Sequence, residues 1–266
     1  MNSFFCFVHL EKTAGSTLHQ LLLESFPRYL SIHPAYLPAH MRRAYLFDAQ
    51  QLKIINRLFH PQGVGGHKIR SYLGYEEVLD RPIRYFTFLR DPVARYISHY
   101  QYQVGQRGLR DSFDEFLENE EACDLQCRRL CGSRSADKAL AEIEKFAFVG
   151  LVEDFVHGLR LLSYHVFENQ LRVRPMKRNT TNHTILPDFG EMEKRWRERI
   201  LANNREDLNL CQAFKDTGYR KYSVEEEHLV EVSSESDTRI SMADKVTKGI
   251  KRYGLEPLSL LLSKAL

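Results

Sequence analysis

The sequence predicts an α/β fold with a central, mostly parallel sheet flanked by helices. Short apolar runs rich in aromatic residues at Phe4–His9, Tyr85–Leu89 and Phe146–Leu151 indicate strands. Segments with helical spacing of apolar residues follow these runs, and repeated strand–helix order is typical of a parallel sheet. The 266 residues, 43% of them hydrophobic, can form one large core, so we predict a single domain over residues 1–266.

Four segments have the pattern of helices. Thr17–Phe26 follows the first strand and spaces its leucines along one helical face. Val93–Tyr102 follows the second strand, and the preceding Asp-Pro pair is typical of a capped helix with proline in its first turn. Phe155–Phe167 is amphipathic, and Glu191–Asn203 alternates charged residues around apolar ones.

Two connections and the C-terminal tail complete the predicted organisation. Arg107–Leu117 and Arg172–Phe189 have no clear periodicity, so we predict long loops near the functional edge of the sheet. The apolar tail "EPLSLLLSKAL" is too short to span a membrane, and we predict that it packs on the core as a helix.

Charge and hydropathy limit the function classes. The net charge of +3 does not indicate a nucleic-acid partner, but it suits an enzyme that handles anions. No stretch approaches the roughly 20 apolar residues of a membrane span, and the first residues lack the basic segment of a signal peptide. We expect a cytoplasmic protein, with a peripheral position at the inner membrane as the alternative.

The five cysteines indicate free thiols. An odd number of cysteines without a secretory signal favours a reducing compartment. Cys123, Cys127 and Cys131 recur at every fourth residue and would share one face of a helix. Zinc would need a fourth ligand and closer cysteine spacing, and the neighbouring sequence offers neither. We predict no metal.

The turn after the first strand is predicted to bind an anion. A helix N-terminus there would present unpaired N–H groups and the positive end of the helix dipole. The glycine would let the backbone approach a ligand, the lysine adds a charge, and the hydroxyls add donors. The loop is not a Walker A motif, because its lysine precedes its glycine, and an ordinary turn with a surface lysine is the alternative. We call this turn the anion cradle; its residues are Lys12, Thr13, Ala14, Gly15, Ser16 and Thr17.

A second turn in the same predicted sheet has a similar character. Arg90 follows the strand Tyr85–Leu89, and Ser98 lies two helical turns further on. An arginine can bind a phosphate through two N–H groups, and a serine can add a hydroxyl. A salt-bridged helix cap is the alternative for this stretch. Two such turns in one sheet predict a ligand with phosphates at two places.

These stretches resemble those of a known enzyme family. "FVHLEKTAGSTL" resembles the 5′-phosphosulfate loop, and "FTFLRDPVARYIS" the 3′-phosphate motif, of sulfotransferases that use 3′-phosphoadenosine 5′-phosphosulfate (PAPS). The carbohydrate branch with the heparan sulfate 2-O- and 6-O-sulfotransferases is most similar, the 6-O type nearest. "GGHKIR", "LQCRRL", "FVGLVEDFVHGLRLL", "RVRPMKRNTT" and "NNREDLNLCQAF" support the resemblance over nearly the whole chain.

The resemblance implies a P-loop-like sulfotransferase fold and transfer of a sulfuryl group from PAPS to a carbohydrate or glycolipid hydroxyl. It places the segment from Arg178 to Thr181 near the adenine of PAPS. Two departures stand out: Glu11 replaces the proline or glutamine common before the lysine, and Cys211 replaces a tyrosine in the last helix. An acid beside a phosphosulfate is unfavourable unless it points away or meets the acceptor.

Roles follow from the chemistry of sulfuryl transfer. Lys12 would neutralise the leaving 5′-phosphate, and no metal is required. The acceptor hydroxyl needs a base, and His67 follows the glycine-rich "GVGG", which we expect to be flexible. The resemblance also places the family's catalytic histidine at His67. His9 is the second candidate and Glu11 the third.

Acceptor binding and the reaction class leave alternatives open. Basic residues that could line a groove for an acidic glycan, or simply face solvent, are Lys68, Arg70, Arg172, Arg174, Lys177 and Arg178. A nucleotide kinase or NTPase would predict magnesium and ATP binding. A non-catalytic nucleotide- or glycan-binding relative would bind without turnover.

Overall fold

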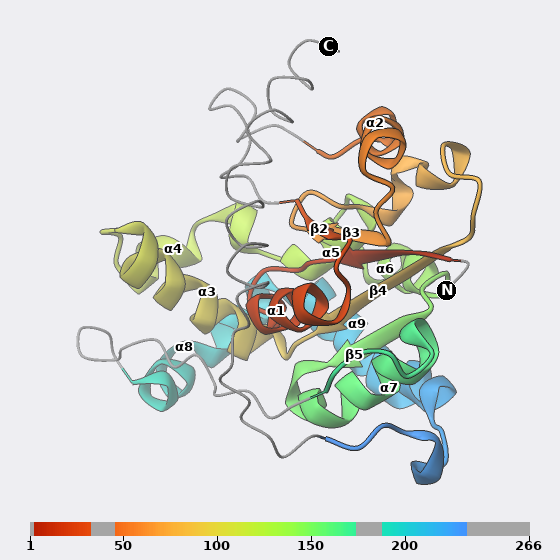
Figure 1. Cartoon of the computed structure of the whole chain (residues 1–266). Coiled ribbons are helices and arrows are strands. Elements are labelled where there is room, and N and C mark those ends of the chain that lie inside the picture. Colours follow the sequence, from red (N-terminus) through yellow and green to blue (C-terminus); the bar gives the residue numbers. More distant parts are fainter. Residues whose placement is uncertain (1–2, 33–45, 174–187, 233–266) are drawn as a thin grey trace.

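The computed structural model describes residues 3–32, 46–173 and 188–232 (Figure 1). These residues contain a five-stranded sheet in the order β2-β3-β1-β4-β5, and every neighbouring pair is parallel. The predicted α/β fold with a central parallel sheet flanked by helices is confirmed. The strands are β1 (Phe4–Val8), β2 (Tyr29–Ser31), β3 (Gly63–Gly66), β4 (Ile83–Leu89) and β5 (Phe148–Leu151).

Helices cover both faces of the sheet. In Figure 1, α1 and α7 lie on the nearer face, and α5, α6 and α9 lie behind the sheet. On the nearer face, the rings of Phe26 and Phe167, which lie at the C-terminal ends of these two helices, are 4.7 Å apart. The helices are α1 (Gly15–Ser25), α2 (Ala49–Phe59), α3 (Pro92–Arg107), α4 (Phe113–Leu117), α5 (Leu125–Cys131), α6 (Ala136–Ile143), α7 (Phe155–Phe167), α8 (Phe189–Asn203) and α9 (Arg205–Ala213).

The four helices predicted from periodicity are present as α1, α3, α7 and α8. Helix α3 runs five residues beyond its predicted end. Its start is as expected, because the Asp91 side chain accepts a hydrogen bond from the Ala94 N–H and proline occupies the first turn. Each of these helices buries one face against the sheet or against other helices. A buried face needs apolar residues at helical spacing, and this spacing is what predicted the helices.

The expectation that "GVGG" is flexible was wrong, because these residues form the buried strand β3. A Cβ at Gly63 would lie 2.3 Å from the Phe5 ring, and one at Gly65 would lie 2.2 Å from the Tyr29 hydroxyl. The glycines therefore make room for large aromatic side chains of the neighbouring strands. With three glycines around the single β-branched Val64, the strand left no recognisable pattern in the sequence.

Other local expectations also need correction. The predicted loop Arg107–Leu117 contains α4, which begins with a capping box between Ser112 and Glu115. Helix α5 begins only at Leu125, so Cys123 precedes it and does not share its face with the other two cysteines. All five cysteines are free thiols. Most of the predicted loop 172–189 and the whole C-terminal tail lie outside the described residues.

The topology brings three strand ends together. Val8 of β1 is paired with Gly66 of β3, and Phe7 is paired with Phe86 of β4. Because the strands are parallel, the residues that follow β3, β1 and β4 emerge at one edge of the sheet. Ligands of open α/β sheets bind at this carboxyl edge.

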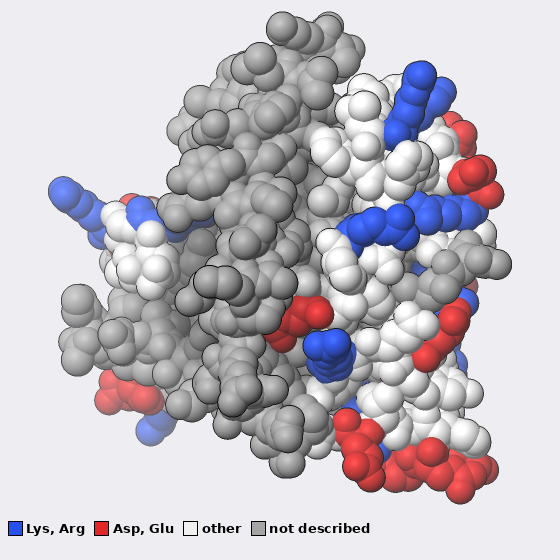
Figure 2. Space-filling model, viewed as in Figure 1, with Lys and Arg blue, Asp and Glu red and all other residues white. Residues whose placement is uncertain are grey.

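The described surface is mixed in charge. On the face drawn in Figure 2, basic and acidic side chains are interspersed, with several acidic side chains grouped at the lower right. Within the described ranges, no helix has both the length and the apolar character needed to cross a membrane.

Candidate functional site

The loop between β1 and α1 has an unusual backbone. Lys12 (φ 69°) and Ala14 (φ 62°) both adopt the left-handed conformation, which costs a non-glycine residue about 1–2 kcal/mol. Left-handed residues in a turn can direct neighbouring backbone N–H groups toward one side, an arrangement that binds anions. Strain of this kind supports a functional role for the cradle that the sequence predicted.

The start of α1 leaves N–H groups available to a ligand. Ala14 occupies the N-cap, no side chain caps the helix, and its first turn contains no acidic residue. Ser16 is exposed and Thr17 is half-buried. Thr13 differs from expectation, because it is fully buried and its hydroxyl donates to the Leu10 carbonyl at 3.0 Å. Its hydroxyl therefore closes the turn and is not a donor to an anion.

Gly15 is needed for a reason that the sequence did not reveal. A Cβ on Gly15 would lie only 1.7 Å from Nε2 of His9. The His9 ring thus fills the space of the missing side chain. His9 itself is buried, and its ring stacks on Phe7 on the strand and on His67, with centroid distances of 5.2 Å and 3.8 Å.

Arg90 joins the second turn to the cradle. Its Nη1 donates to the Lys12 carbonyl at 2.9 Å. The backbone of Arg90 is held by the buried amide of Gln126, which accepts from the Arg90 N–H at 3.0 Å and donates to the Arg90 carbonyl at 2.9 Å. The two turns predicted separately are therefore parts of one site.

The electrostatics of this site suit an anion. Burial lowers the pKa of Lys12, and the nearby charge of Arg90 lowers it further. The Lys12 ammonium lies 4.4 Å from the ring centroid of Tyr102 on α3, a cation–π contact. An anion between Lys12 and Arg90 would relieve their repulsion. Ser98 is half-buried on the same helix, and its side chain makes no hydrogen bond to another described residue.

His67 follows β3 and has a defined protonation pattern. Its Nδ1 is 3.1 Å from the His9 carbonyl, which can only accept, so Nδ1 carries the proton. In the neutral ring, Nε2 is then the nitrogen that can take up a proton. The turn that carries His67 is held by Arg70, whose Nη1 donates to the carbonyls of His67 and Ile69 at 2.8 and 2.7 Å.

Glu11 is engaged by an arginine that the sequence analysis did not select. Arg129 on α5 donates to both Glu11 oxygens, with distances of 2.6, 2.9 and 3.1 Å. Burial of Glu11 opposes its ionisation, but Arg129 and then His67 outweigh burial and lower its pKa to about 2. Glu11 is therefore ionised at neutral pH, which makes it a poor general base.

The residues predicted for acceptor binding differ in how far they are exposed. Lys68 is half-buried beside His67, and burial followed by the charges of Arg129 and Arg70 lowers its pKa. Arg70 is only 2% exposed, so its role is to hold the backbone. Arg172 is exposed. Arg174, Lys177, Arg178 and Thr181 lie outside the described residues.

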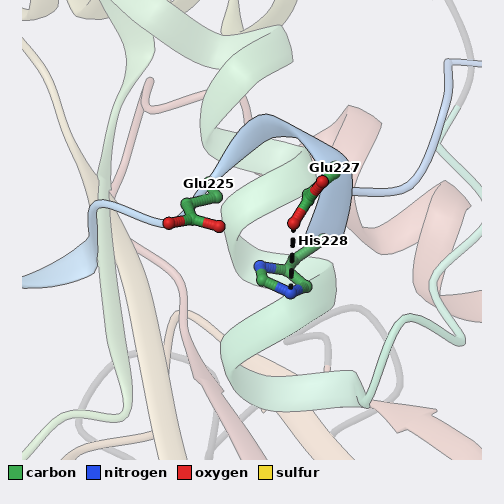
Figure 3. Close-up of side chains that lie close together, drawn as sticks. All are labelled: Glu225, Glu227 and His228. Atoms are coloured by element: carbon green, nitrogen blue, oxygen red, sulfur yellow. Dashed lines mark ion pairs between the residues drawn. The ribbon is translucent and has the colours of Figure 1, made fainter.

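One group of side chains could in principle approach a metal ion. Figure 3 shows Glu225, Glu227 and His228 close together on an exposed turn, with His228 4.0 Å from Glu227. Exposed acidic groups of this kind are common without an ion, and the group lies on a separate turn after α9. It gives no reason to assign a metal to the cradle.

Several residues of the site were missed from sequence alone. Gln126 and Arg129 lie in "LQCRRL", and the only signal was the resemblance of that stretch. Tyr102 reaches Lys12 from α3, 90 residues further along the chain, so its spacing gave no sign of the contact. No known protein-family model matches the chain, and no curated protein matches it.

Proposed function

We propose that the protein is a PAPS-dependent sulfotransferase that acts on a hydroxyl of a carbohydrate or glycolipid. The hydrogen bond from Arg90 to the Lys12 carbonyl carries the proposal, because it makes two anion-binding turns into one site. A ligand with one phosphate at the cradle and another near Arg90 fits this arrangement. The donor and its product, adenosine 3′,5′-bisphosphate, both have this form.

The cradle and His67 have separate roles in the proposed chemistry. The acceptor oxygen attacks sulfur, and the bond from sulfur to the 5′-phosphate oxygen breaks. Lys12 and the N–H groups at the start of α1 stabilise the charge that grows on the departing phosphate. The acceptor proton passes to Nε2 of His67, the nitrogen left without a proton when Nδ1 donates to the His9 carbonyl.

A magnesium-dependent kinase or NTPase is supported less well. The carboxylates near this edge already have partners: Glu11 pairs with Arg129, and Glu153 accepts from the Asp91 N–H at 2.7 Å. Asp91 itself caps α3. We expect full sulfotransferase activity in excess EDTA, whereas strict dependence on added magnesium would favour the kinase or NTPase.

The direct test is incubation of the protein with ³⁵S-labelled PAPS and a panel of glycans and glycolipids. Label should appear in one acceptor class, with release of one adenosine 3′,5′-bisphosphate for each sulfate ester. The alternative of a non-catalytic binding protein predicts nucleotide binding without labelled product.

His67→Ala tests the base. The expected loss in kcat is roughly 10²–10⁴-fold, with unchanged affinity for the bisphosphate. His165→Ala is the matched control, because His165 is also half-buried and its Nε2 is 2.9 Å from a backbone carbonyl, that of Tyr222. Normal turnover in folded His67→Ala would contradict the assignment and move attention to His9.

Arg90→Ala tests the donor site. Loss of a charged hydrogen bond should weaken binding of the bisphosphate by about 10–150-fold. Arg84→Ala is the control, because Arg84 lies at the other end of the same strand and pairs with Glu168. Equal affinity of the unmodified protein for AMP and for the 3′,5′-bisphosphate would contradict the proposal.

A further inference from the structure

Three side chains form a hydrogen-bonded chain beside the anion cradle. The Tyr29 hydroxyl on β2 is 2.7 Å from Nδ1 of His19 on α1, and His19 Nε2 is 3.1 Å from Nδ1 of His9. We propose that this chain fixes the proton of His9 on Nε2, so that His9 donates an N–H to the anion at the start of α1. The identity of that anion rests on the proposed function, whereas the protonation pattern does not.

The direction of the chain follows from its buried end. Tyr29 is fully buried, and burial, followed by the nearby Cys6, raises the pKa of its hydroxyl well above the ordinary value. The hydroxyl therefore keeps its proton. Among the described residues it has one side-chain partner, His19 Nδ1. If it accepted from that nitrogen, its own proton would be buried without an acceptor, which is costly.

The remaining protons are then assigned in order. Tyr29 donates to His19 Nδ1, so His19 carries its own proton on Nε2 and donates it to His9 Nδ1. His9 accepts at Nδ1 and must carry its proton on Nε2. That nitrogen is the atom closest to the missing Cβ of Gly15, the first residue of α1.

This pattern also suits the neighbouring base. His67 stacks on His9 with ring centroids 3.8 Å apart, so a positive charge on His9 would oppose proton uptake by His67. A neutral His9 with a fixed N–H donor gives the cradle a hydrogen bond without adding a charge beside His67. His19 and Tyr29 act through His9 and are positioning residues.

Histidine NMR reads the protonation pattern without any assay of activity. The intact protein labelled with ¹⁵N at histidine should show His9 protonated at Nε2 and unprotonated at Nδ1. Tyr29→Phe removes the end donor and should give a mixture of the two His9 tautomers. Tyr222→Phe is the matched control, because it removes a buried hydroxyl beside β5, at the opposite edge of the sheet from β2.

A pair of variants at His19 separates chemistry from packing. In His19→Gln the side-chain amide can still donate to His9 Nδ1, so the His9 tautomer should be retained. In His19→Leu that donor is lost, and the tautomer should become mixed. The two His19 variants therefore test whether the hydrogen-bonded chain fixes the His9 tautomer, even if Tyr29→Phe does not fold.

Calorimetric titration with adenosine 3′,5′-bisphosphate supplies the second readout. Tyr29→Phe and His19→Leu should bind about 3–10-fold more weakly than the unmodified protein, with His19→Gln close to it. A His9 proton on Nδ1 in the unmodified protein, or variants with unchanged tautomer and affinity, would overturn the proposal. If the unmodified protein does not bind the bisphosphate, the proposed function is refuted instead. The NMR spectra would still test the proposed protonation pattern of Tyr29, His19 and His9.

Discussion

Replacing Gly15 with alanine tests whether His9 is the reason that the cradle needs a glycine. The added methyl would lie 1.7 Å from His9 Nε2 and 2.1 Å and 2.3 Å from two ring carbons, whereas ordinary contact begins at 3.4 Å. The backbone itself does not require glycine there, because Gly15 begins a right-handed helix and is absent from the residues with positive φ. The imidazole must therefore move.

The cost can be worked out from what holds His9 in place. Its hydrogen bond to His19 contributes about 1 kcal/mol, and its stacking contacts with Phe7 and His67 contribute about 0.5–1.5 kcal/mol each. Displacing the ring loses these contacts, so Gly15→Ala should lower the free energy of unfolding by about 2–4 kcal/mol. Urea unfolding followed by far-UV circular dichroism measures this change.

The double variant makes the test specific. With His9 replaced by alanine, the space at Gly15 opens, so adding Gly15→Ala should cost nothing or stabilise the helix by up to about 1 kcal/mol. Gly105→Ala, at an exposed position in α3, is the control for the general effect of alanine in a helix. An equal cost of Gly15→Ala with and without His9 would refute the reasoning. Unchanged stability with weakened bisphosphate binding would show that the glycine serves only ligand approach.

Three further changes test other parts of the structure. Asp207→Ala should lower the free energy of unfolding, measured in urea, by about 3–5 kcal/mol, because it leaves the fully buried Arg95 without its carboxylate partner. Asp207→Asn should cost less, because the amide oxygen can still accept hydrogen bonds from backbone N–H groups of α5. Glu11 has its pKa lowered to about 2 by Arg129 and His67 against burial, so its contribution to stability is present above about pH 4.5 and is lost as the pH falls toward 2. The stability difference between the unmodified protein and Glu11→Gln should shrink over that range, and a constant difference would contradict the ion pair. Tyr102→Leu should weaken bisphosphate binding about 3–10-fold while Tyr102→Phe does not, because the ring supports the Lys12 ammonium; equal binding by both variants would argue against that support.

The fold class was predictable because its strongest elements carry local patterns. The aromatic run Tyr85–Leu89 lies within β4, and the amphipathic segment Phe155–Phe167 is α7 itself. Strand β3 was missed because three of its four residues are glycines. Their lack of a side chain leaves room for the aromatic rings of the neighbouring strands. This fit is a long-range packing effect, and composition within the segment cannot reveal it.

The candidate site was predictable only in its local parts. The turns after β1 and β4 were predicted separately, each from neighbouring residues, whereas the left-handed backbone at Lys12 and the bond from Arg90 to the Lys12 carbonyl were not. The partnership of Glu11 with Arg129 joins positions 118 residues apart, and its only signal was the family resemblance of the stretch "LQCRRL". The same holds for Gln126, whose amide fixes the Arg90 backbone from another helix.

The strand order brings these distant residues to the two sides of the cradle. Strand β1 lies between β3 and β4, so the cradle that follows it has a neighbour on each side. On the β4 side, Arg90 reaches the cradle backbone and Gln126 holds it there. On the β3 side, His67 donates to the backbone directly after β1. In the proposed reaction the bisphosphate lies toward β4 and the acceptor enters toward β3, with the sulfuryl group above β1. An in-line displacement needs the attacking and leaving oxygens on opposite sides of sulfur, and β3 and β4 flank the cradle strand β1 on opposite sides.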